Sequence, residues 1–243
     1  TYFGGFFADK ILGLRKSQLS GCLLMIVDSF TLPLAPGDLF YIGTSISIVG
    51  TGFFKPNISG IVGFLYHDGD KRRDAGFALF YSGINIGALL GGYLCFNLGD
   101  NYGWEWAFIS AGIAMVIGLA VFGGGMRSLG PLGFSPLADK EGMKASSVQL
   151  AQIGVYIGSL IMIPFILILV QNSSYTDLFM YIVGPIALLY LLYEMTRCTR
   201  EQVSKLLAAL VFIIFSIFFW AFFEQSGGSL AIVAREHVTH NIA

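Results

Sequence analysis

The stretch Gly50-Thr-Gly-Phe-Phe-Lys55-Pro-Asn57 places a lysine in the middle of a hydrophobic run that is long enough to cross a bilayer. Between Phe40 and Leu65, Lys55 is the one formally charged residue. A lysine at the centre of a membrane helix costs about 2.5–3.5 kcal/mol, so it normally faces a protein interior or a water-filled path. We therefore expect Lys55 to be functional; the alternative is a lysine that extends toward the cytoplasmic surface.

The composition around this stretch is that of a membrane protein. Hydrophobic residues make up 55% of the chain, charged residues 12%, and the mean hydropathy is +0.73, whereas a soluble domain carries about 25% charged residues. Seven apolar stretches have about the length of a membrane span. They cover residues 18–34, 39–65, 75–98, 104–125, 148–170, 178–193 and 206–223. The predicted fold class is all-α, a polytopic transmembrane helix bundle.

Charge and cysteine content exclude several other classes. The formal net charge is −1, and no sustained basic run is present, which argues against a nucleic-acid partner. Cys22, Cys95 and Cys198 are scattered and odd in number, so they indicate neither a disulfide framework nor a metal site. We expect no cofactor and no metal, and we expect the lipid bilayer to be the surrounding medium.

The basic residues indicate the orientation in the membrane. Twelve of the fourteen lysines and arginines fall on one side when the seven spans alternate. They are Lys10, Arg15, Lys16, Lys71, Arg72, Arg73, Arg127, Lys140, Lys144, Arg197, Arg200 and Lys205. Basic loops are enriched on the inner side of membranes, so these segments are predicted to be cytoplasmic in a multi-pass protein of the cell membrane.

Three motifs carry a family resemblance. The first is Gly4-Gly-Phe-Phe-Ala-Asp9-Lys-Ile-Leu-Gly13-Leu-Arg15-Lys16, in which Gly5, Asp9, Gly13 and Arg15 resemble the loop between helices 2 and 3 of the major facilitator superfamily. The second is the Lys55 stretch with Gly69-Asp-Lys-Arg-Arg-Asp-Ala-Gly-Phe-Ala-Leu-Phe-Tyr-Ser-Gly-Ile-Asn-Ile-Gly87, and the third is Phe219-Trp-Ala-Phe-Phe-Glu-Gln225. Both resemble motifs of the proton-dependent oligopeptide transporter (POT/PTR2) family.

This resemblance implies a partial major facilitator fold. Residues 1–125 would form the amino-terminal half, from the end of helix 2 to helix 6, and residues 126–147 a cytoplasmic linker. Residues 148–200 would form the extra two-helix hairpin of prokaryotic members, and residues 201–243 would begin the carboxy-terminal half with helix 7. We expect an internal fragment whose partners include the remaining helices of the same protein.

Two polar residues on the fifth helix of that scheme are candidates for substrate contact. Tyr81 and Asn85 are four residues apart and share one helical face. An amide offers donors and an acceptor that suit a peptide. An interhelical hydrogen bond is the alternative for Asn85, and the resemblance favours the peptide site. Within the family, the lysine at position 55 would contact carboxylates of helices 1 and 10.

Trp220 and Glu224 have the same spacing on the predicted helix 7. A carboxylate in an apolar setting favours its neutral form unless a cation pairs with it, so Glu224 is a candidate for proton coupling and gating. The alternative is a structural ion pair. The resemblance implies that Trp220 lines the peptide cavity and that an arginine of helix 1 pairs with Glu224. Asp28, a further acid inside a span, is expected to lie near the outer surface in contact with water.

These observations predict a proton-coupled symporter that imports di- and tripeptides by alternating access. Two alternatives stay open: a transporter with the same fold for another solute, such as nitrate or an amino acid, and a non-transporting membrane scaffold. A membrane enzyme would need a cluster of nucleophilic or metal-binding side chains, and the sequence contains none.

Overall fold

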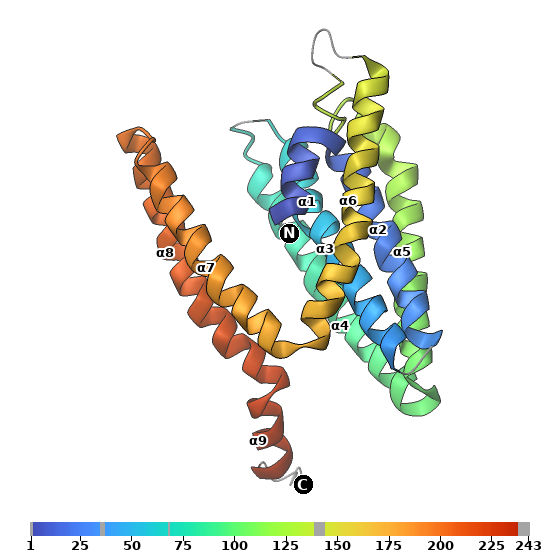
Figure 1. Cartoon of the computed structure of the whole chain (residues 1–243). Helices are drawn as coiled ribbons and strands as arrows, with labels where there is room; N and C mark the ends of the chain where they lie inside the picture. Colours follow the sequence, from blue (N-terminus) through green and yellow to red (C-terminus); the bar gives the residue numbers. More distant parts are fainter. Residues whose placement is uncertain (1, 35–36, 68, 139–143, 238–243) are drawn as a thin grey trace. The chain divides into compact units, whose positions relative to one another are not determined.

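The computed structural model describes residues 2–34, 37–67, 69–138 and 144–237. Throughout these ranges the regular structure is helical, which confirms the predicted all-α class (Figure 1). The long helices are α2 (Leu14–Thr31), α3 (Asp38–Phe64), α4 (Arg73–Tyr102), α5 (Trp104–Gly125), α6 (Ala145–Gln171), α7 (Ser173–Met195) and α8 (Arg200–Phe223). The short ones are α1 (Tyr2–Phe7), α9 (Ser229–His237), the π-helix η1 (Ala8–Leu12) and the 3₁₀-helices η2 (Leu32–Leu34), η3 (Met126–Leu129) and η4 (Glu224–Gly227).

Six helical segments of the described chain are long and apolar enough to cross a membrane. They are Leu14–Leu34, Arg73–Tyr102, Trp104–Leu129, Ala145–Gln171, Ser173–Met195 and Arg200–Phe223. The seventh expected span, at residues 39–65, forms the 27-residue helix α3, which has the length of a span. It is not among the six because Lys55, Pro56 and Asn57 interrupt its apolar sequence.

The chain divides into two compact units, residues 1–176 and 177–243, and the division falls in the first turn of α7. In the first unit, α2 contacts both α3 and α5, α6 lies against α3, and α4 lies against α5 (Figure 1). A core cluster of Leu12, Val49, Phe53 and Val155 joins η1, α3 and α6. The first helix of the predicted hairpin therefore packs on α3.

Glycines set the spacing of α1, α2 and α3. A Cβ atom added to Gly21 of α2 would lie 2.7 Å from the backbone nitrogen of Phe54 and 2.8 Å from the carbonyl oxygen of Gly50. A Cβ atom added to Gly4 of α1 would lie 2.0 Å from the carbonyl oxygen of Gly52. Both positions therefore exclude any side chain, as is typical of helices that pack closely in membranes.

Pro56 explains why Gly4 approaches this particular carbonyl. Proline has no N–H group, so the carbonyl oxygen of Gly52, four residues earlier, lacks its helical donor. Helix α3 nevertheless continues through Pro56 to Phe64. The backbone of Gly4 lies against the freed oxygen, at a place where a side chain would not fit.

Asp28 is buried, with 4% of its surface exposed. The hydroxyl of Ser29 donates to its Oδ1 at 2.9 Å, and Ser47 of α3 bonds to the same carboxyl group. The expectation that water contacts Asp28 is therefore wrong for the part of the chain that the structure describes. Serines of α2 and α3 supply the hydrogen bonds that this buried carboxyl group needs. The hydropathy of a span cannot predict such hydrogen-bond partners, because it does not depend on which helices are neighbours.

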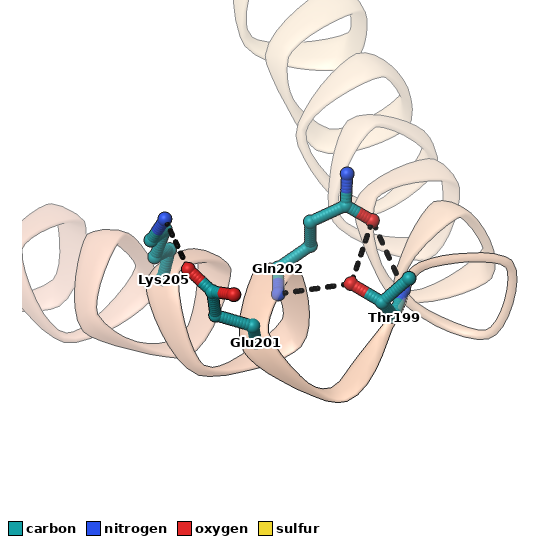
Figure 2. Close-up of polar contacts among 4 residues, drawn as sticks. All are labelled: Thr199, Glu201, Gln202 and Lys205. Carbon is teal, nitrogen blue, oxygen red and sulfur yellow. Dashed lines mark hydrogen bonds and ion pairs between the residues drawn. The ribbon is translucent and has the colours of Figure 1, made fainter.

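In the second unit, α8 begins with a capping box (Figure 2). The backbone N–H of Thr199 donates to Oε1 of Gln202 at 3.0 Å, and the backbone N–H of Gln202 donates to the Thr199 hydroxyl at 3.5 Å. One turn further, Lys205 pairs with Glu201 at 2.8 Å. Such an exposed pair contributes about 0.3–0.5 kcal/mol, so the cap is the main local signal for the start of this helix.

We predict that Gly21→Ala lowers the stability of the full-length protein by about 1–3 kcal/mol, because the methyl group meets backbone atoms that cannot move aside. The matched control is Gly118→Ala on α5, where an added Cβ atom has nothing within 4 Å. Alanine there is expected to be neutral or to stabilise the helix by up to about 1 kcal/mol. Thermal unfolding in one detergent measures both variants, and equal losses of stability would contradict the assigned role of Gly21.

Candidate functional site

Lys55 lies on the face of α3 that is turned away from α1 and α2. Its side chain is exposed, whereas Phe53 and Asn57 on either side of it are buried. The amide of Asn57 donates to the carbonyl oxygen of Phe53 at 2.6 Å, which supports the helical turn that carries the lysine. Among the described residues, Lys55 has no acidic partner within ion-pair distance. Its ammonium group is therefore presented to whatever adjoins this face.

Tyr81 and Asn85 lie on one face of α4, and both are exposed. The amide nitrogen of Asn85 donates to the backbone oxygen of Tyr81 at 2.9 Å, so within the described chain the amide bonds to its own helix. The alternative of an interhelical bond is not realised in this part of the protein. Cβ atoms added at Gly83, Gly87 and Gly91 would meet nothing within 4 Å. These glycines lie on a different side of α4 from Tyr81 and Asn85, so within the first unit neither side of the helix is covered at this level.

Trp220 and Glu224 belong to the second unit. Trp220 is 50% exposed and makes edge contacts with the rings of Phe219 and Phe223, at centroid distances of 5.5 and 5.3 Å. Glu224 begins η4 directly after the last residue of α8, and its side chain is exposed. The carboxylate therefore stands at a helix end beside an aromatic cluster.

The motif of Gly5, Asp9, Gly13 and Arg15 forms the corner between α1 and α2. Gly13 separates η1 from α2 with a φ of +78°, a conformation that favours glycine. A Cβ atom on Gly5 would make an ordinary contact, 3.7 Å from the Cβ of Pro56, whereas Cβ atoms on Gly4 and Gly13 would lie 2.0 Å from the Gly52 oxygen and 2.5 Å from the Phe134 backbone. Asp9 is exposed in the first turn of η1.

Arg15 binds the first part of the predicted linker, a contact that the sequence did not reveal. Its backbone N–H donates to the Gly133 oxygen at 3.1 Å, and its Nη2 donates to the Gly130 oxygen at 2.5 Å. The guanidinium carbon lies 4.4 Å from the centroid of the Phe134 ring, a cation–π contact. The hydroxyl of Ser135 also donates to the Ile11 oxygen. Residues 130–135 are therefore fixed to the corner.

Asp70 forms a turn with Arg72 in the loop directly before α4. Its Oδ1 accepts the backbone N–H of Arg72 at 2.9 Å, and its Oδ2 pairs with the Arg72 guanidinium at 2.9 Å. These hydrogen bonds lower the pKa of Asp70 to about 2. The sequence places this loop in a family motif, and an aspartate whose side chain accepts the backbone N–H two residues later is the usual pattern of such a turn.

A comparison with protein families gives a match to the POT family over residues 19–243. The chain belongs to the POT family. Members of this family in the solved structures have the fold expected from the resemblance. One crystal structure of a peptide transporter POT in complex with sulfate is 28% identical, with a TM-score of 0.70 over 100% of this chain and 50% of that one. Another, a POT family transporter in complex with a thioalcohol-conjugated peptide, is 29% identical with a TM-score of 0.76.

Curated relatives give the same result. The chain is 32% identical over 250 residues to the uncharacterized transporter YclF of Bacillus subtilis. It is 31% identical to the peptide transporter YePEPT of Yersinia enterocolitica and 30% identical to the di-/tripeptide transporter of Lactococcus lactis. These alignments cover 96–98% of this chain but 48–49% of the relatives. The chain is thus part of a multi-pass membrane protein family and spans about half the length of these relatives.

We predict that the stabilising effect of the Asp70 carboxylate depends on pH. Because the folded pKa is about 2 and the unfolded value is about 3.9, the contribution is complete above the unfolded pKa and disappears as the pH falls through the folded pKa. Asp70→Asn should therefore lower the thermal midpoint of the full-length protein at pH 6, with the difference from the unsubstituted protein narrowing between pH 4 and about pH 2.

Arg72→Gln removes the partner and serves as the matched test. It should reproduce most of the pH dependence, because the side-chain hydrogen bonds from Arg72 are the largest cause of the lowered Asp70 pKa, while the bond from the backbone N–H of residue 72 remains. A difference between Asp70→Asn and the unsubstituted protein that stays constant down to pH 2 would show that the carboxylate is not held in this pair.

Proposed function

We propose that the protein containing this chain is a proton-coupled symporter that imports di- and tripeptides by alternating access across the cell membrane, with its basic loops in the cytoplasm. The supporting observation is membership of the POT family over residues 19–243, together with relatives named for peptide and di-/tripeptide transport. The family is a family of transporters, and no catalytic step is part of the proposal.

The exposed polar groups of the first unit support a central path. Lys55 of α3 and the Tyr81–Asn85 face of α4 lie on membrane helices, and within the first unit these three side chains are exposed. Contact with lipid would cost several kcal/mol for the ammonium group alone. Because the chain spans about half the length of its relatives, we assign the cover to the remaining half of the transporter and to water between the halves.

The chemistry of these groups suits a short peptide. The Lys55 ammonium would pair with the peptide carboxylate, a charge-assisted hydrogen bond of the stronger kind. The free oxygen of the Asn85 amide would accept from the peptide ammonium or backbone, and Tyr81 would add a ring and a hydroxyl. Trp220 would provide an apolar wall for a side chain of the peptide.

Glu224 would couple the proton to the movement. When its carboxylate is ionised, a cation of the other half can pair with it and hold the two halves together. Protonation removes that attraction, so the pair opens and the halves tilt about the central site. Its position at the end of α8, where the helix changes to a 3₁₀ turn, is suited to a contact that forms and breaks.

Uptake of labelled dialanine into proteoliposomes tests the function. The full-length protein is expected to accumulate dialanine when the outside is acidic and to show little uptake when the proton gradient is collapsed. Gradient-driven uptake of nitrate or of a free amino acid, without uptake of any peptide in a panel, would overturn the peptide substrate. Absence of transport of every solute would overturn transport itself.

We predict that Lys55→Gln reduces gradient-driven dialanine uptake about 10- to 150-fold, the value of one charge-assisted hydrogen bond of about 1.5–3 kcal/mol. Lys71→Gln, an exposed lysine in the loop before α4, is the matched control and should leave uptake unchanged. If both variants transport like the unsubstituted protein, Lys55 is a surface lysine and not part of the path.

We predict that Glu224→Gln abolishes accumulation driven by the proton gradient while exchange of internal for external dialanine continues. The reason is that glutamine keeps the shape of the protonated acid but cannot release the proton. Glu201→Gln on the same helix, whose carboxylate pairs with Lys205 (Figure 2), is the control and should retain both activities. Loss of exchange together with accumulation would indicate a structural role for Glu224.

A further inference from the structure

A pocket of about 280 Å³ lies where two membrane spans end and the linker begins. One wall is the beginning of α2, with Arg15, Lys16 and Leu19, and another is η3, with Met126 and Arg127. The docked residues 133–135 of the linker complete it. The spans Leu14–Leu34 and Trp104–Leu129 begin and end at these walls, so the pocket adjoins the level of the bilayer surface.

The charges around this pocket are unbalanced. Arg15, Lys16 and Arg127 all line it, and no acidic side chain is among the described residues that do. None of the three forms an ion pair with an acid within the described chain. Like charges gathered in one place repel each other, so the arrangement favours a bound anion.

The donors of these side chains are partly unused. Arg15 donates through Nη2 to the Gly130 oxygen, and its Nε atom is buried without a hydrogen-bond partner among the described residues, so the remaining Nη donors are the ones that a ligand can reach. Lys16 gives one donor to Oε1 of Gln152 at 2.6 Å, which leaves two more on its ammonium group. Arg127 is exposed. An anion with several acceptor oxygens could accept hydrogen bonds from these three side chains.

We propose that this pocket binds a phosphate group. Three acceptor oxygens on a tetrahedral centre can accept from two guanidinium groups and an ammonium group at once. Basic pockets at the cytoplasmic ends of membrane helices bind the headgroups of anionic lipids, and the apolar side chains of Leu19 and Met126 provide walls beside the charges. The same donor set would also accept free inorganic phosphate. This inference is independent of which solute the protein transports.

Bound phosphate would join two parts of the chain that are distant in sequence. Arg15 and Lys16 belong to the beginning of α2, and Arg127 belongs to the turn after α5. A single anion that contacts all three would hold η3 and the docked linker against α2, in addition to the bonds from Arg15 to Gly130 and Gly133. The ligand would therefore stabilise the cytoplasmic end of this unit.

Native mass spectrometry of the full-length protein in detergent tests the proposal. The protein is titrated with phosphatidylglycerol, with phosphatidylcholine as the lipid of zero net charge, and separately with inorganic phosphate. The variant is Lys16→Gln with Arg127→Gln, which keeps the Arg15 contacts to the linker. The control is Arg200→Gln with Lys205→Gln, two exposed cations of the second unit, so the loss of charge is the same.

The expected result is that the Lys16→Gln/Arg127→Gln variant binds phosphatidylglycerol about 30-fold more weakly than the unsubstituted protein, at about 1 kcal/mol for each removed charge. The control variant should bind it normally. Displacement of this lipid by millimolar inorganic phosphate, or direct phosphate binding with the same loss in the variant, would identify free phosphate as the source. Equal binding of both anions by variant and control would overturn the site.

Single substitutions keep the test valid if the double variant does not fold. Lys16→Gln and Arg127→Gln alone should each weaken binding about 5-fold, and Arg127→Lys, which keeps the charge, should restore most of it. A thermal midpoint equal to that of the unsubstituted protein shows that each variant is folded. If Arg127→Lys binds as weakly as Arg127→Gln, the charge of this residue is not what the ligand contacts, and the proposal fails.

Discussion

The contact of α3 with α1 and α2 through glycine is the constraint on which the first unit depends. Helices in a bilayer gain little from burying apolar side chains against each other, because lipid is equally apolar, so close van der Waals packing has to supply the attraction. Gly4, Gly21, Gly50 and Gly52 provide it by removing side chains where the backbones meet. The same contact lets α1 cover the carbonyl oxygen that Pro56 leaves without a donor.

This packing also orients the polar residues of α3. Once Gly50, Phe53 and Asn57 are turned toward the neighbouring helices, Lys55 has to point to the opposite side. The energetic cost of a charge on that side is the reason that the proposed function places a second half of the protein, or water, against it. The position of the lysine is therefore a consequence of how the glycines pack.

Much of the fold could be predicted because hydropathy and span length are local properties of the sequence. The seven expected stretches all form helices, and the uneven distribution of basic residues is visible in the sequence itself. Contacts between distant residues leave no such local trace. The sequence around Asp28 does not indicate that a serine of α3 forms a hydrogen bond with its carboxyl group. The sequence around Arg15 likewise does not indicate that the ring of Phe134, more than a hundred residues later, lies beneath its guanidinium group. The family motifs identified five candidates for the peptide site and for proton coupling: Lys55, Tyr81, Asn85, Trp220 and Glu224. That these side chains line one common site stays a prediction, because Lys55 and Glu224 belong to different units.

The docking of residues 130–135 on the α2 corner affects how proteins of this family can be recombined. The segment from Met126 to Ala138 looks like a connector in the sequence, yet its backbone and its Phe134 ring belong structurally to the first unit. In a chimaera joined at residue 126, Arg15 would come from one parent and the carbonyl groups and ring that it contacts would come from the other. A crossover placed after Ala138 would keep that assembly whole, so the functional border between the two parents lies about a dozen residues later than hydropathy alone would place it.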